Sequence, residues 1–197
     1  MENVDGLLTQ AKSGIDSLGV SKKYVDSAMK WLGIWLTDDV FSDYVPQIKH
    51  LIKAKNWEFL LDSFYQVIPF GTGGRRGLVG VGPNRINTWT VQASAQGHAQ
   101  YLIKQFGDQA KRQGIVLTYD VRKYNQKGIY ADSLPNPVMN LDCKQLAVAA
   151  ADHRLAVDVL AESQLLTMME SVEEVHPREH VDRILPFHAE LHSLLGA

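Results

Sequence analysis

Helical periodicity dominates the first 66 residues of the chain. Apolar side chains recur three and four positions apart in three runs, a spacing that places each run on one face of a helix. Asn56 can cap the third helix, and the stretch around Pro46 indicates a break between helices. We interpret the aromatic-rich stripe as core packing rather than as a cofactor-binding surface. The three runs are Val4, Leu7, Leu8, Ala11 and Ile15; Tyr24, Ala28, Trp31, Leu32 and Trp35; and Trp57, Leu60, Leu61 and Phe64.

The pattern changes after residue 66. Short apolar runs at 66–70 and 78–81 predict two strands, and Asn87 or Thr88 can cap the helix that follows. Gly107 suits the end of this helix. Its spacing predicts one buried face, made of Val91, Ala95, Ala99, Leu102 and Phe106.

Two further elements complete this part of the chain. The continuous apolar run Ile115–Tyr119 is typical of a strand that is covered on both faces. Residues 142–151 favour another helix. The order is therefore β-α-β-α, the pattern of a mixed or parallel α/β layer.

Composition separates the last 46 residues from the rest. The chain has 12 lysines and all of them precede residue 152, whereas five of its seven histidines follow it. Such a shift indicates a boundary between modules or a change in the origin of the coding sequence. We therefore predict an α/β protein in three parts: an N-terminal helical extension (1–66), an incomplete mixed β-α-β-α domain (67–151) and a helical tail of unrelated composition (152–197).

The charge and the single cysteine narrow the function classes. A formal net charge of -2 gives no electrostatic support for nucleic-acid binding, which usually uses a strongly basic face. No apolar run reaches membrane-spanning length, and the N-terminus lacks the pattern of a signal peptide. Cys143 is the only cysteine, which fits a reducing compartment. We expect a cytoplasmic protein with neither a nucleic-acid nor a membrane partner.

The candidate chemistry lies in residues 70–87, which we call the glycine-arginine segment. Its sequence, FGTGGRRGLVGVGPNRIN, holds six glycines and three arginines in 18 residues. Glycines let a backbone turn tightly and approach a ligand closely, and arginines present forked donors that suit phosphate oxygens. The alternative is a purely structural hairpin. A second candidate pair, Asp120 and Arg122, follows the predicted strand at 115–119, where ligands gather in α/β sheets; an ion pair or a helix cap is the alternative.

These two segments together resemble the α-D-phosphohexomutase family, the phosphoglucomutases and phosphomannomutases. The glycine-arginine segment is similar to the family motif F-G-T-x-G-x-R-G followed by N-R-I-N, and LTYDVRKYNQKG is similar to the strand that ends in Y-D-x-R. The resemblance covers about residues 1–151, as the first domain with its N-terminal helical extension. It implies four domains around a cleft, a phosphoserine that exchanges its phosphoryl group with a hexose phosphate, and Mg²⁺ held by a D-x-D-x-D loop.

The resemblance assigns roles to residues of the first motif. Thr72 and Arg76 match its threonine and arginine, and Arg76 is the candidate cation beside the transferred phosphoryl group. Gly71, Gly74 and Gly77 would shape the loop around that group. The residue at 75 falls on a variable position of the motif and is not counted among the site residues.

Four more residues are assigned in the same way. Arg85 and Asn87 match N-R-I-N and belong to the phosphate-binding loop, where they should fix the loop on the first helix. Asp120 and Arg122 match D-x-R and should orient neighbours of the active site rather than take part in the chemistry.

The resemblance stops near Ala151, before the parts that carry the reaction. The family's T-x-S-H loop and its D-x-D-x-D sequence do not occur in the chain. We therefore expect no metal or other cofactor in this chain, although the full-length family uses Mg²⁺, and no mutase turnover by the chain alone. The alternative is a non-catalytic binding or assembly module. Expected partners are a hexose phosphate, a second copy of the chain, or the missing mutase domains.

Two weaker signals have ordinary explanations. His176 and His180, like His188 and His192, are four residues apart and could hold zinc on neighbouring helices. No cysteine or acidic ligand pattern accompanies them, so solvated histidines are the preferred interpretation. Cys143 is interpreted as a small packed residue rather than a nucleophile.

Overall fold

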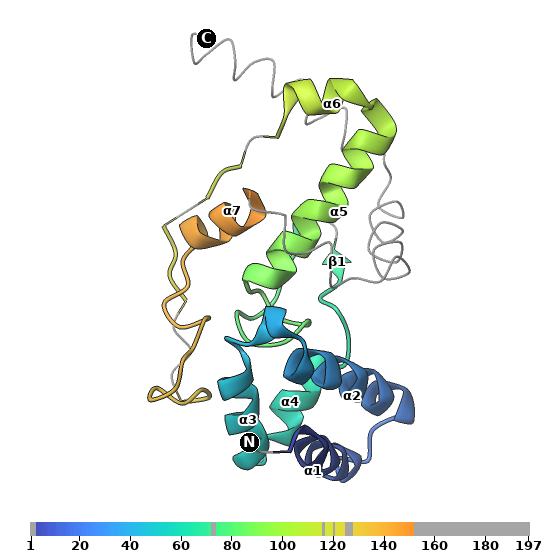
Figure 1. The fold of residues 1–197 in the computed structure, drawn as a ribbon, viewed down its shortest axis with the longest axis vertical. Coiled ribbons are helices and arrows are strands. Elements are labelled where there is room, and N and C mark those ends of the chain that lie inside the picture. Colours follow the sequence, from blue (N-terminus) through green and yellow to red (C-terminus); the bar gives the residue numbers. More distant parts are fainter. Residues whose placement is uncertain (1–2, 72–73, 116, 120, 125–127, 152–197) are drawn as a thin grey trace.

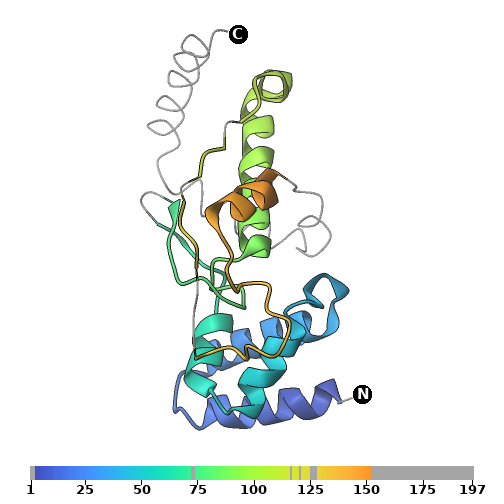
Figure 2. The ribbon, with the colours of Figure 1, turned by 90° about the vertical axis from the view of Figure 1, so that its left-hand side faces the viewer.

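The computed structural model describes residues 3–71, 74–115, 117–119, 121–124 and 128–151. These residues are mostly helical, with one small two-stranded sheet. Figure 1 shows the N-terminal helices gathered at one end of the molecule, the long helix α5 leading away from them, and α6 at the far end. Figure 2 shows α7 lying across α5.

The three predicted N-terminal helices are confirmed. They are α1 (Val4–Asp16), α2 (Lys22–Thr37) and α4 (Trp57–Phe64). Most of the predicted apolar positions are buried, but Tyr24 is 46% exposed. Asn56 occupies the N-cap position of α4 as predicted, although its side chain makes no capping hydrogen bond.

The region predicted as a break contains two further helices. The 3-10 helix η1 (Asp39–Phe41) starts at Asp38, whose side chain accepts a hydrogen bond from the backbone of Val40. Helix α3 (Val45–Lys53) follows, with Pro46 in its first turn. Proline is tolerated there because the first backbone N–H groups of a helix have no partner within it. The proline therefore marks the start of a helix rather than an interruption.

The core of the helical end is an aromatic cluster around Trp35, which is completely buried. The Trp35 ring stacks on Phe41 with 4.2 Å between ring centroids and meets Phe64 edge to face at 5.6 Å. Trp89, in the first turn of α5 (Thr88–Phe106), joins the same cluster at 5.7 Å from Trp35. The N-terminal helices and α5 therefore share one core.

The predicted strands are shorter than expected. β1 (Phe70–Gly71) pairs antiparallel with β2 (Gly74–Arg75) in a hairpin, so only Phe70 of the run 66–70 lies in a strand. In the run 78–81, Val79 makes an isolated parallel bridge with Ile86. The described residues therefore hold a two-stranded sheet in place of a longer α/β layer.

Helix α5 begins as predicted, but it buries a different face. Asn87 caps it through a capping box, and it ends at Gly107, which has a positive φ of 55°. A short helix that was not predicted, α6 (Asp108–Gln113), follows directly. The expected buried face is wrong, because Trp89 anchors α5 in the aromatic cluster and so fixes its rotation. The buried residues are Trp89, Thr90, Ala93, Gln96, Gly97 and Tyr101.

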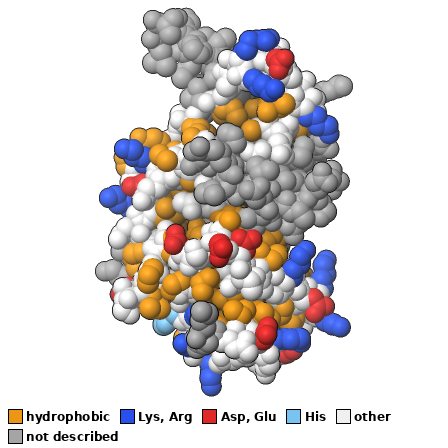
Figure 3. All heavy atoms as spheres, in the orientation of Figure 1, with side chains coloured by type: hydrophobic (Ala, Val, Ile, Leu, Met, Phe, Trp, Pro, Cys, Tyr) orange, Lys and Arg blue, Asp and Glu red, His pale blue; other side chains and the backbone are white. Residues whose placement is uncertain are grey.

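The expectation of a covered strand at 115–119 is also wrong. Its described residues lie in no strand, and Ile115, Leu117 and Tyr119 are 50%, 46% and 57% exposed. The physical reason is the absence of a neighbouring strand along this run in the described part of the chain. Figure 3 shows that hydrophobic side chains reach the surface in several places on the face drawn there.

The last described helix is α7 (Cys143–Ala151), which confirms the prediction for 142–151. Its start is fixed by Asp142, whose side chain accepts a hydrogen bond of 2.8 Å from the backbone of Gln145. The predicted helical tail and its histidine pairs lie outside the described residues. Within the described part, none of the helices is both long and apolar enough to cross a membrane.

Candidate functional site

The glycine-arginine segment begins with the β1–β2 hairpin. Gly71 pairs with Gly74 in the register of the two strands, and Thr72 lies between them, outside the described residues. Gly74 has a φ of 117°, in the region that side chains rarely adopt, so the return strand starts at a position that favours glycine. The hairpin brings Gly71 and Gly74 of the predicted site together.

Arg75 in β2 and Arg76 directly after it lie in different environments. Arg76 is exposed, as is Gly77, so the guanidinium predicted to face a phosphoryl group is accessible to a ligand. Arg75 is half-buried, and its Nε and Nη1 atoms are buried without a hydrogen-bond partner among the described residues. Burial lowers the pKa of the Arg75 guanidinium to about 10. The sequence motif placed the chemistry on Arg76 and gave no signal for the burial of Arg75.

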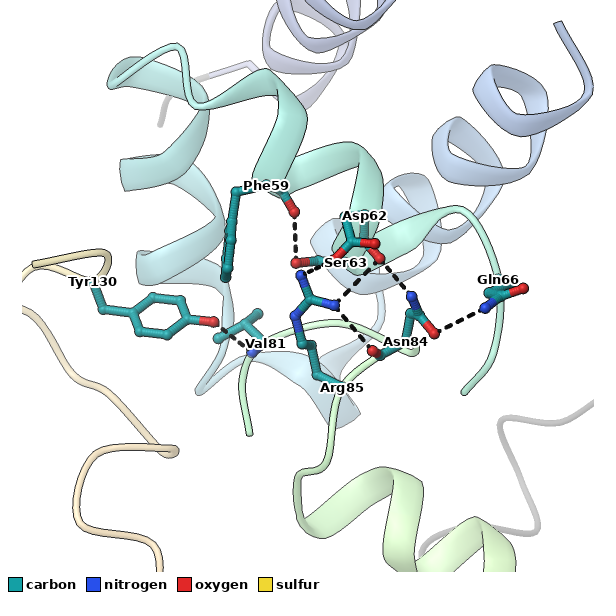
Figure 4. A network of polar contacts seen from close by, with 8 residues as sticks. All are labelled: Phe59, Asp62, Ser63, Gln66, Val81, Asn84, Arg85 and Tyr130. Atoms are coloured by element: carbon teal, nitrogen blue, oxygen red, sulfur yellow. Dashed lines mark hydrogen bonds and ion pairs between the residues drawn. The ribbon is translucent and has the colours of Figure 1, made fainter. Parts of the chain in front are cut away.

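Arg85 is buried against the N-terminal helices and does not face solvent. It is 3% exposed, and its Nη2 atom donates to the Asp62 carboxylate at 2.5 Å (Figure 4). Its guanidinium also lies over the ring of Phe59, 4.8 Å from the centroid. Arg85 therefore fixes the glycine-arginine segment to α4 and is not positioned to bind a phosphate itself.

Asn87 connects the same segment to the start of α5. It is completely buried, and its side-chain oxygen accepts a hydrogen bond from the Thr90 backbone at the start of α5. Its side-chain nitrogen donates to the carbonyls of Gly80 and Gly82 at 2.8 and 2.9 Å. One side chain thus caps α5 and fixes the backbone of the loop before it.

Three residues that the sequence reasoning missed complete this support. Asp62 is the carboxylate partner of Arg85, and the Tyr130 hydroxyl accepts a hydrogen bond of 2.9 Å from the backbone of Val81 (Figure 4). Burial raises the pKa of Tyr130 to about 12. Gln47 of α3 bonds the backbone of Ala131 through both ends of its amide, at 3.0 Å each. Nothing in the sequence marks these long-range pairs, because their partners are 23 to 84 positions apart.

The second predicted pair is only partly described. Asp120 lies outside the described residues. Arg122 is exposed, and its backbone carbonyl accepts a hydrogen bond of 3.2 Å from the Cys143 backbone at the start of α7. The neighbouring Lys123 forms an isolated antiparallel backbone bridge with Asp142. The structure therefore places Arg122 beside the N-terminus of α7.

The part of the chain that the structure describes contains no candidate metal site. Among the described residues there is no group of three histidine, cysteine or acidic side chains that could hold one. Cys143 is half-buried, with its sulfur 3.4 Å from the hydroxyl of Tyr124. We therefore derive no chemical step through Mg²⁺ for this chain.

Comparisons with known proteins show which family this part of the chain is similar to. Residues 67–132 match the family model "Phosphoglucomutase/phosphomannomutase, alpha/beta/alpha domain I". Over 94 residues, 48% of the chain, the sequence is 38% identical to the human phosphopentomutase. It is 31% identical over 93 residues to a phosphoglucomutase of Staphylococcus aureus, and 36% identical over 91 residues to the mouse glucose 1,6-bisphosphate synthase. No solved structure matches the chain.

These findings show that the middle of the chain resembles domain I of the α-D-phosphohexomutases. The matched region includes the β1–β2 hairpin, Arg85 and Asn87. The aligned residues span only 15% of the human relative, 16% of the bacterial one and 14% of the mouse one.

Proposed function

We propose that the chain carries the front part of a sugar-phosphate mutase, in which the β1–β2 hairpin presents Arg76 and Thr72 to a phosphoryl group. The observation that carries this proposal is the domain I match over residues 67–132, with an exposed Arg76 at the arginine of the motif. Phosphoryl transfer needs in-line positioning and positive charge on the moving oxygens more than covalent chemistry. An exposed guanidinium on a short hairpin suits that requirement.

In this proposal the N-terminal helical extension (1–66) supports the loop of a partial mixed β-α-β-α domain I (67–151), and a helical tail (152–197) follows. The ion pair between Asp62 and Arg85 and the shared aromatic core support the first role. Arg85 and Asn87 then position the loop. Gly71, Gly74 and Gly77 allow its backbone to approach the ligand, and Asp120 and Arg122 orient their neighbours.

The proposed ligand is a phosphorylated sugar. The sequence resemblance implies a hexose phosphate, and the relatives' names include both a pentose and a hexose mutase. The described residues have no feature that would select one of these sugars over the other. A cytoplasmic location remains a prediction from the sequence.

We further propose that the 197-residue chain does not turn over sugar phosphates by itself. It contains neither a T-x-S-H loop nor a D-x-D-x-D sequence, and so lacks the family's nucleophile and metal ligands. Conversion of glucose 1-phosphate by the pure chain at an ordinary enzymatic rate would overturn this proposal.

A non-catalytic binding or assembly role is the second candidate, and one observation favours it. The apolar side chains of the run from Ile115 to Val121 that the structure describes are exposed, with Val121 at 97%. Exposed apolar residues gathered in one segment suit an interaction with another chain. The partner would be a second copy or a polypeptide that carries the missing mutase domains.

Thermal unfolding with and without a sugar phosphate tests the proposed ligand. A bound ligand stabilises the folded state, so glucose 1-phosphate or ribose 1-phosphate should raise the Tm of the chain. Arg76→Gln should abolish this rise, and Arg112→Gln should preserve it, because Arg112 is an exposed arginine on α6 away from the hairpin. An equal rise in Arg76→Gln and wild type would contradict the proposal.

A further inference from the structure

Arg75 is the only described residue with two buried side-chain polar atoms that lack a hydrogen-bond partner. These atoms are its Nε and Nη1. A buried guanidinium is costly unless a charge and hydrogen-bond acceptors compensate for the lost water. The described residues give neither of these two atoms a hydrogen-bond partner, and burial lowers the pKa of the guanidinium.

Arg85 shows how this protein can compensate a buried guanidinium for the loss of water. Arg85 is also buried, but it bonds the Asp62 carboxylate and the Asn84 carbonyl and lies over the Phe59 ring. Arg75 lies on the same segment and makes none of these contacts with the described residues. An anion with hydrogen-bond acceptors would supply what the described residues do not give to Arg75.

A cavity next to Arg75 has room for that anion. Its volume is about 170 Å³, and it lies between the hairpin and the first two turns of α5. A single water needs roughly 10–15 Å³ of such space, so an oxyanion of several atoms fits. The cavity is lined by Phe70, Arg75, Ile86, Thr90, Val91 and Ser94.

The two hydroxyl groups of the cavity differ in availability. The Thr90 hydroxyl donates to the Arg85 and Asn87 carbonyls and accepts from the Asn87 N–H, so it is already engaged. The Ser94 hydroxyl makes one bond, of 2.5 Å, to the carbonyl of Thr90. Because Ser94 lines the cavity, its hydroxyl would be available to a ligand there if this bond were exchanged. Arg75 and Ser94 can then contact one ligand together.

We propose that this cavity is a binding site for a phosphate-class oxyanion, with Arg75 as its cationic partner and Ser94 as a second donor. The planar fork of arginine matches the oxygens of such an anion. The site shares the β1–β2 hairpin with the proposed mutase loop but does not use Arg76. Arg75 lines a cavity against α5, whereas Arg76 is exposed to solvent, so either proposal can fail without the other.

The experiment titrates the full chain with inorganic phosphate at constant ionic strength and follows two signals, the Tm and the Nε–H resonance of Arg75. The resonance is assigned by its loss in Arg75→Met. Wild type should show a saturable rise in Tm and a shift of the resonance. Arg75→Met should weaken phosphate binding about tenfold or more, the typical effect of losing a charge-assisted hydrogen bond. Arg112→Met, which removes an exposed arginine, should bind as wild type does.

Two further variants keep the proposal falsifiable if Arg75→Met folds poorly. Arg75→Lys retains the charge without the fork and should bind more weakly than wild type. Arg76→Gln should leave the phosphate-induced shift of the Arg75 resonance unchanged, even if it loses the response to sugar phosphates. Glucose 1-phosphate in place of phosphate distinguishes the source of the anion: a matching shift shows that a monoester enters, and no shift shows that the free ion is preferred. The proposal is overturned if phosphate leaves the Arg75 resonance of wild type unmoved, or if Arg75→Met binds phosphate as tightly as wild type.

Discussion

Helices α1–α4 bury most of their apolar faces, whereas the run from Ile115 to Val121 exposes the apolar side chains that the structure describes. In the helical end, Leu32 and Trp35 are completely buried, while Leu117 and Tyr119 are 46% and 57% exposed. A helix satisfies its backbone hydrogen bonds internally, so it needs only side-chain packing from its neighbours. A strand needs another strand beside it for its backbone groups. Apolar composition alone therefore does not bury this segment, which pairs with no strand among the described residues.

The glycine-arginine segment lies between these two regions and is fixed by the helical one. Arg85 and Asn87 connect it to α4 and α5, and the Tyr130 hydroxyl bonds its backbone at Val81. The following predictions test this division of the molecule, beginning with the largest expected effect.

Trp35→Ala should produce the largest loss of stability, about 3–5 kcal/mol, because it removes a completely buried aromatic side chain. Urea unfolding followed by fluorescence or circular dichroism measures the change. Tyr24→Ala is the control, since Tyr24 is 46% exposed and should cost about 1 kcal/mol. Similar losses in the two variants would contradict a core centred on Trp35.

Gly82→Ala should destabilise the chain by about 2–3 kcal/mol. Gly82 has a φ of 118°, and an added Cβ would collide with the backbone carbonyl of Ser63 in α4. Gly107→Ala is the matched control: it has a positive φ of 55° but no described atom within 4 Å of an added Cβ. Gly107→Ala should therefore lower the stability of the chain only through backbone strain. A smaller loss of stability for Gly82→Ala than for Gly107→Ala would contradict the close contact between α4 and the loop at Gly82.

Raising the pH should weaken the contact between Tyr130 and the loop. The unfolded phenol has a pKa of 10.0 and burial raises the folded value to about 12, so the folded state holds the proton while the unfolded state releases it. The stability from this group is present below pH 10 and is lost as the pH rises toward 12, by up to about 2 kcal/mol. Tyr130→Phe removes the group, so the wild-type and variant stabilities should converge between these pH values. Parallel pH profiles would contradict the assignment.

Asp62→Asn should destabilise the chain by about 1–2 kcal/mol, because it leaves the buried Arg85 without its carboxylate. The expected loss is smaller than for a fully buried pair, since the Asp62 side chain is 55% exposed and solvent screens it. Combining it with Arg85→Met should restore part of the lost stability. Strictly additive effects in this double-mutant cycle would show that the two side chains are not coupled.

Val121→Ser should change the stability of the isolated chain least, by no more than about 0.5 kcal/mol, because Val121 is 97% exposed. If the exposed run pairs with a second chain, the same substitution should reduce association measured by analytical ultracentrifugation. Lys30→Ser on the exposed face of α2 is the control. A loss of monomer stability as large as that of Asp62→Asn would show that Val121 is packed, against the structure.

The sequence predicted the helical part of the fold well and the strands poorly. The spacing of Leu7, Ala11 and Ile15 is a local property, and a helix forms from such local contacts. The rotation of α5 was mispredicted because Trp89 anchors it in a core built by distant residues. Pro46 suggested an interruption, and only its place in the first turn of α3 shows that a helix starts there.

The candidate site also has features that the sequence identifies and features that depend on tertiary packing. Glycine density and the motif residues Arg76 and Asn87 are enough to identify the segment from its sequence. The buried state of Arg75 and the carboxylate of Asp62 beside Arg85 cannot be read from the motif, because both depend on how α4 and α5 pack around the loop.

The sequence by itself determined the N-terminal helices, the cap of α5 at Asn87 and the resemblance to domain I, because each rests on residues close together in the chain. Only the tertiary structure decided which side chains become buried. It placed Arg85 on α4, left Arg75 beside a cavity without a partner among the described residues, and left the apolar run at 115–121 exposed where it is described. The physical reason is that burial depends on contacts between distant segments, and a local pattern does not specify those neighbours.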